Sequence, residues 1–223
     1  MPKLKQPLTD QEAAALLHAS PVTDQDIAAN LTDRREWRTQ QRLAVQWFLS
    51  AAAATDVNLF CHYCAMVDNW NAWLPALRGY IRAAQPAAPQ IREYFIQAYL
   101  EHGAGIRIAV LNDLILADAY RLLLPPYSGP GLRLYRGDSA RNRRNRTYGL
   151  AWSADINVAR SFAEETWVKK EGDSVLLETD APSNAIICAP GEHDDRFAEA
   201  EYIVDRRRLK SIKVIDRFVA ISP

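Results

Sequence analysis

The stretch Glu199-Ala200-Glu201-Tyr202-Ile203-Val204 places two carboxylates one residue apart, directly before an apolar run. Alternate side chains of a β-strand share one face, so an extended segment would point Glu199 and Glu201 the same way. Two acids on one face are costly unless a cationic group uses them. The stretch therefore predicts either a charged strand edge that resists aggregation or a site for a positively charged partner.

Length and composition limit the class of protein. The 223 residues are enough for one large domain or two small ones, and 27 basic residues balance 27 acidic ones. This balance removes the global electrostatic argument for nucleic-acid binding but leaves a local one open. Cys61 and Cys64 form only half of a zinc site, so we expect helix packing there and no metal. The sequence shows neither a signal-peptide pattern nor a membrane-spanning run, and we expect a cytoplasmic protein without a membrane partner.

Residues 1–128 are expected to be helical almost throughout. Apolar periodicity predicts helices over 33–54, 58–84, 91–100 and 106–124, and Pro75 would end, kink or begin a helix. The segment 102–105, His-Gly-Ala-Gly, is predicted to be a helix end with its loop. The Pro- and Gly-rich segment 125–131 stops helix formation, so a domain boundary is placed there.

The pattern changes after this boundary. Short alternating or apolar runs predict strands over 132–137, 148–153, 175–178, 185–188, 202–204 and 212–215, and an amphipathic helix is predicted over 155–169. One helix among many strands favours an α+β domain of packed small sheets.

Two further segments carry residues suited to a site. In Tyr135-Arg136-Gly137, an arginine at a strand end followed by glycine offers a planar fork to a diphosphate without steric obstruction. In Trp152-Ser153, a serine at a strand end can fix a carboxylate or a ribose hydroxyl. The ordinary interpretations are a surface ion pair for the arginine and a helix-start hydroxyl for the serine.

In this order the three segments resemble the mono-ADP-ribosyltransferases of the arginine–serine–glutamate class, over about residues 132–216. The resemblance implies an α+β fold in which residues 129–223 form an ADP-ribosyltransferase-like split β-sandwich. Residues 1–128 would be an all-helical region that supports the target, a partner or the NAD cleft. That family's serine motif usually carries two hydroxyls, and here Ala151 stands at the first of them. Ser153, Tyr148 and Ser161 are the candidate substitutes.

The resemblance also implies roles for individual residues. Glu201 would bind the ribose 2′-hydroxyl of NAD and stabilise the positive charge that develops on the ribose as the nicotinamide bond breaks. Glu199 would hold the acceptor and take its proton, and Ser153 would orient Glu201 or the ribose. The cofactor-binding set is Tyr135, Arg136, Gly137, Trp152 and Ser153, and the acceptor-binding set is Phe197 and Glu199.

The expected function is the transfer of ADP-ribose from NAD to a macromolecule by a toxin or effector, with a protein arginine as the favoured acceptor. The segment Arg141–Arg146 is rich in arginine and leaves RNA or DNA open as the acceptor, although it could equally be a solvated loop. NAD hydrolysis without an acceptor is also open, as is a non-catalytic module that kept the fold. A neutralising antitoxin or immunity protein is the partner that such a toxin implies.

Overall fold

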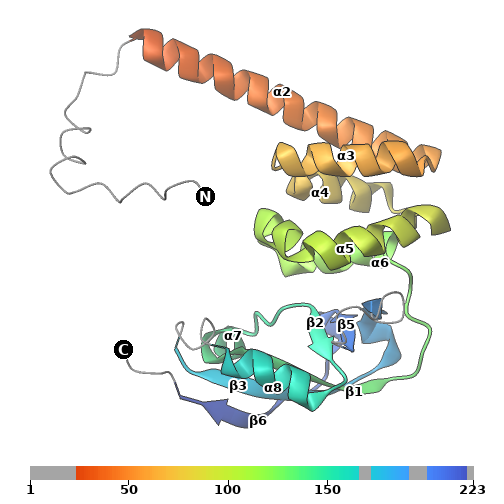
Figure 1. The fold of residues 1–223 in the computed structure, drawn as a ribbon, viewed down its shortest axis with the longest axis vertical. Coiled ribbons are helices and arrows are strands. Elements are labelled where there is room, and N and C mark those ends of the chain that lie inside the picture. Colours follow the sequence, from red (N-terminus) through yellow and green to blue (C-terminus); the bar gives the residue numbers. More distant parts are fainter. Residues whose placement is uncertain (1–23, 166–171, 191–199, 220–223) are drawn as a thin grey trace, which may run out of the picture. The chain divides into compact units, whose positions relative to one another are not determined.

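The computed structural model describes residues 24–165, 172–190 and 200–219. Within these ranges the chain has seven α-helices and a six-stranded antiparallel sheet, and five of the helices precede the first strand (Figure 1). The predicted α+β class, with helices mostly in the N-terminal part, is confirmed. The chain divides into two compact units, residues 1–40 and 41–223, and the second contains every strand. No helix in the described part of the chain is both long and apolar enough to span a bilayer.

The helices before the sheet begin and end where local side chains satisfy the backbone. Asp56 accepts a hydrogen bond from the Leu59 N–H, and Asn112 accepts from the first turn of its helix. Pro75 lies in the first turn of a helix, where a missing N–H costs nothing, so it begins a helix and does not kink one. The five helices are α2 (Asp24–Ala54), α3 (Val57–Asn69), α4 (Trp73–Ala83), α5 (Pro89–Val110) and α6 (Asp113–Leu123).

The segment 102–105 is helical, so the prediction of a helix end there was wrong. Helix α5 continues through Gly103 and Gly105 to Val110. Packing explains Gly103, because a Cβ there would lie 3.1 Å from the ring of Tyr99, one turn earlier. Helix propensity alone disfavours two glycines in a helix, and the burial of Ile106 and Val110 outweighs that cost.

The six strands form one sheet in the order β4-β5-β2-β1-β3-β6, in place of the expected packed small sheets. Strand β2 pairs with β5 over its whole length. It shares only one registered pair with β1, so β1 and β2 diverge beyond that pair. The strands are β1 (Leu132–Ser139), β2 (Ala151–Ser153), β3 (Ser174–Ala181), β4 (Ile186–Cys188), β5 (Glu201–Val204) and β6 (Lys213–Phe218). Helix α7 (Ala140–Asn145) follows β1, and α8 (Ile156–Glu164) follows β2.

The two faces of the sheet belong to different cores. Ile203 of β5 packs into the core formed by the N-terminal helices, whereas the next residue, Val204, packs into a second core with Leu134, Trp152 and Leu177. Side-chain alternation then assigns Glu201 to the helix-covered face, because it lies two residues before Ile203. Helix α8 packs mainly on β1 and covers the same face, because Gly137, two residues after Tyr135, lies against its backbone.

Candidate active site

Three of the predicted site residues form one row across neighbouring strands. Tyr135 on β1 is directly opposite Ser153 on β2, and Ser153 is directly opposite Glu201 on β5. Residues opposite each other in an antiparallel pair have Cβ atoms about 4.5–5.5 Å apart and share a face. The three segments are far apart in the sequence, and the sheet brings them together between α8 and the N-terminal helices.

The carboxylate of Glu201 accepts a hydrogen bond from a helix that sequence reasoning did not connect to the site. The hydroxyl of Tyr99, on α5, donates to Oε1 of Glu201 at 2.6 Å. This distance lies at the short end of the range for O–H···O hydrogen bonds. Glu201 as a whole residue is partly exposed, and this contact joins its Oε1 to α5.

Ser153 is buried and its Oγ accepts a hydrogen bond from the backbone N–H of Asp155 at 2.9 Å. Asp155 in turn caps α8 by accepting from the Asn157 N–H. The helix-start role, one of the two roles predicted for this serine, is therefore present. The hydroxyl also lies in the row beside Glu201, so the two roles are compatible.

Arg136 follows Tyr135 on β1 and so lies on the opposite face from Ser153 and Glu201. Its Nε donates to Asp138 at 2.7 Å, and its Nη1 donates to the carbonyl of Ala151, where β1 and β2 diverge. Its Nη2 lies against Gly149, close to a second guanidinium, that of Arg107. The ion pair expected of Arg136 is thus realised inside the protein, not at its surface, since only 16% of the side chain is exposed.

The partner of Arg136, Asp138, is a buried charge. Burial by itself raises the pKa of its carboxyl, but the Arg136 guanidinium and hydrogen bonds from Arg136, Asn142 and the Ser139 N–H outweigh burial. The pKa of Asp138 is therefore held below its ordinary value, and the group is ionised at neutral pH. Arg136 and Asp138 therefore form an ion pair on the face of β1 opposite the one that carries Tyr135, and the guanidinium also binds the Ala151 carbonyl.

Gly137 has a different reason for being glycine from the one expected. A Cβ at this position would lie within 2.9 Å of three backbone atoms of α8, the closest being the N atom of Ala163 and the carbonyl oxygen of Ala159. Helix backbone fills the space that the prediction reserved for a diphosphate. Close helix–strand packing is therefore what the glycine permits.

Trp152 is only 2% exposed and packs edge-on against Tyr148 in the second core. Its Nε1 is buried without a hydrogen-bond partner among the described residues. The ring is thus part of the support under β2, away from the face that carries Glu201. Tyr135, by contrast, is partly exposed on that face.

Glu199 and Phe197, the predicted acceptor residues, lie outside the described residues. Strand β5 begins at Glu201, and Ala200 before it has a φ of 42°, in the left-handed region.

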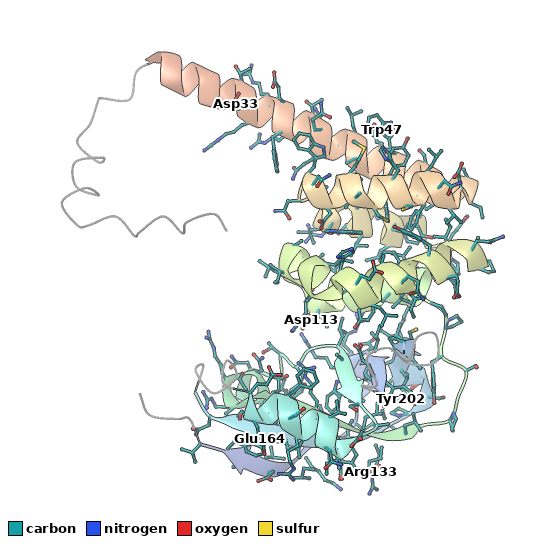
Figure 2. The ribbon with its side chains drawn as sticks, in the orientation of Figure 1. Asp33, Trp47, Asp113, Arg133, Glu164 and Tyr202 are labelled. Carbon is teal, nitrogen blue, oxygen red and sulfur yellow. The ribbon has the colours of Figure 1, made fainter. Side chains whose placement is uncertain are left out.

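The arginine-rich segment 141–146 is mostly helix α7, so the prediction of a loop was wrong, although Arg144 and Arg146 are exposed to solvent. Arg143 donates to the hydroxyl of Tyr148 at 3.0 Å, whereas Arg141 is exposed. A second group of arginines connects η3 (Arg206–Arg208) to α6. Arg206 pairs with Asp113 at 3.1 Å, and Arg207 joins Asp118 to the buried Asp205. Figure 2 labels Asp113 on the side of the helices that faces the sheet.

Sequence reasoning missed Tyr99 and Arg107, because both belong to a helix that was assigned to packing. Their only sequence signal is a polar group on an otherwise apolar stretch, which many surface helices share. Comparisons of the chain with known protein families, with curated proteins and with solved structures find no match.

Proposed function

We propose that this protein is a mono-ADP-ribosyltransferase that moves ADP-ribose from NAD to a macromolecular acceptor. One observation supports the proposal most strongly. The arginine, serine and glutamate segments of the resemblance lie on three hydrogen-bonded neighbours, β1, β2 and β5, with Tyr135, Ser153 and Glu201 in one row. Chance matches to three weak motifs would have no reason to fall on adjacent strands in matching register.

The chemistry assigned to this row is a displacement at the ribose C1′ of NAD. The bond to nicotinamide breaks and nicotinamide leaves with the electron pair, so positive charge develops on the ribose. The Glu201 carboxylate accepts a hydrogen bond from the ribose 2′-hydroxyl and opposes that charge. A nucleophile of the acceptor forms the new bond to C1′ and gives its proton to a base, a role proposed for Glu199. A protein arginine is the favoured acceptor.

Arg136 has a more restricted role in this proposal than an open phosphate clamp. Its Nε and Nη1 are bonded to Asp138 and to the Ala151 carbonyl, so Nη2 is the group through which it would contact a phosphate. Arg107, whose Nη2 also lies near Gly149 and donates to Asp113 at 3.1 Å, would supply a second cation there. The divergence of β1 from β2 at this point is the feature that favours a split sheet of the ADP-ribosyltransferase kind.

A non-catalytic binding module is the second candidate, and the internal bonding of Arg136 favours it. A guanidinium held by Asp138 and by a backbone carbonyl already has a structural reason to be present. The alanine at 151, where the serine motif usually has a hydroxyl, also favours a non-catalytic module. Under this candidate the row of Tyr135, Ser153 and Glu201 would be a relic of the fold without turnover.

The test measures nicotinamide release by the full chain in buffer alone and in cell extract, with labelled NAD. The proposal expects label on macromolecules and a loss of about 100- to 1,000-fold in rate for Glu201→Gln. Glu101→Gln is the matched control, because Glu101 is an exposed acid on α5 and should leave the rate unchanged. A Glu201→Gln variant as active as the wild type would refute the assignment, and an absence of turnover by the wild type would favour the binding module.

Digestion of the labelled material identifies the acceptor. Label released by protease but not by nuclease supports a protein acceptor. Label that resists protease and yields to nuclease would replace it by RNA or DNA, and nicotinamide release that extract does not accelerate would indicate NAD hydrolysis.

A further inference from the structure

We infer that Tyr99 is a positioning residue for Glu201, and that its hydroxyl supplies the hydrogen bond for which the serine motif has lost a donor at Ala151. The inference rests on the proposed function for its catalytic meaning. It goes beyond that function because it makes α5, on the N-terminal side of the expected domain boundary, part of the site.

The contact itself is direct. The Tyr99 hydroxyl donates to Oε1 of Glu201 at 2.6 Å, and the two residues come from α5 and β5. The side chain at position 151 is a methyl group and cannot donate. A carboxylate with one oxygen anchored has its second oxygen restricted in direction, and a catalytic acid needs this restriction to face the ribose.

The ring of Tyr99 is held so that its hydroxyl has little freedom. The ring of Tyr120 packs edge-on against it, with centroids 5.5 Å apart and an interplanar angle of 82°. Gly103 also leaves room for the ring, because a Cβ there would approach it to 3.1 Å. Gly103, which has a low helix propensity, thus leaves the space that the Tyr99 ring occupies when its hydroxyl contacts Glu201.

The protonation state also suits a permanent donor. Burial, and after it the nearby Glu201 carboxylate, raise the pKa of Tyr99 well above its ordinary value. The phenol therefore keeps its proton throughout the working range of pH and acts only as a donor. Tyr99 orients the carboxylate but does not transfer a proton.

The experiment compares Tyr99→Phe with Tyr120→Phe in the full chain. Both variants remove one hydroxyl from the same pair of packed rings, but only the first removes the bond to Glu201. We expect Tyr99→Phe to lower kcat by about 10- to 100-fold with KM for NAD changed less than about threefold. Tyr120→Phe should keep both constants. An equal loss in the two variants, an unchanged kcat in Tyr99→Phe or an increase in kcat would overturn the inference.

A stability cycle separates failure of this inference from failure of the proposed function. The shift in unfolding midpoint caused by Tyr99→Phe is measured in the wild type and in Glu201→Met. Methionine lacks the carboxylate oxygen that accepts the hydrogen bond from Tyr99. A shift at least halved in the second background supports the contact even if the wild type turns over no NAD. Equal shifts in both backgrounds would overturn the contact whatever the activity.

Discussion

Replacing Gly137 of β1 by alanine should destabilise the protein more than the same replacement at Gly103 or Gly105 of α5. The added Cβ would lie 2.3 Å from the N atom and 2.9 Å from the Cα atom of Ala163, and 2.4 Å from the carbonyl oxygen of Ala159. All three are backbone atoms, so no side-chain rotation relieves the overlap. Because the best non-bonded separation is about 3.5–4.0 Å, α8 would have to move away from β1 by about 1 Å.

The magnitude follows from what that movement disrupts. Ala159 and Ala163 are 2% and 0% exposed, so α8 lies directly against the sheet and has no gap to close. Overpacking of this kind costs about 1–3 kcal/mol, and we expect about 3 kcal/mol because backbone must move. For a domain of this size that loss lowers Tm by about 6–12 °C.

Urea unfolding followed by far-UV circular dichroism measures this change, with Gly105→Ala as the control. Gly105 lies inside α5 with nothing within 4 Å of an added Cβ, so alanine there should stabilise the helix by about 0.5–1 kcal/mol. If Gly137→Ala does not lower the urea midpoint below that of the wild type, the close packing of α8 on β1 is refuted.

Three other changes test the charges and thiols of the fold. Asp138→Asn should cost about 3–5 kcal/mol in urea unfolding, because it leaves a mostly buried guanidinium without its anion, whereas Asp180→Asn, at an exposed ion pair, should change the midpoint little. The pKa values of Asp138 and Asp205 are lowered in the folded protein, so their stabilisation is complete above the unfolded pKa of about 3.9 and is lost as pH falls below it. A Tm that stays flat from pH 7 to pH 3 would contradict this pair of assignments. A thiol reagent should label Cys61 rapidly in the native protein and the buried Cys64 and Cys188 only in denaturant, and native labelling of all three would contradict the packing of α3 and β4.

The pH prediction depends on the arginines that surround each acid. Burial alone would raise the pKa of Asp205, but hydrogen bonds and charge from Arg207, with the charge of Arg121, outweigh it. Both acids are therefore ionised in the folded state down to a lower pH than in the unfolded chain. Protonation must then favour unfolding, which gives the stated direction.

Local patterns in the sequence were enough for most of the elements. Alternation in Leu132–Gly137 predicted β1, and the apolar run after Glu201 predicted β5, because a strand's side-chain period is a local property. The continuous α5 was not predicted, since Gly103 and Gly105 disfavour a helix locally. Their cost is outweighed by burial of Ile106 and Val110, which depends on partners distant in the sequence.

The candidate site also has features that the sequence predicts and features that depend on tertiary contacts. The sequence by itself determined the order of the arginine, the serine and the glutamate, the strand-end positions of Ser153 and Glu201, and the alanine at 151, but its placement of Arg136 at a strand end was wrong, because β1 continues to Ser139. Only the tertiary structure decided that β1, β2 and β5 are neighbours, that Arg136 is held by Asp138, and that Tyr99 reaches Glu201. Strand order, and contacts between a helix and a sheet, are set by the burial of surfaces from distant segments, and no local pattern of residues records which segments will meet.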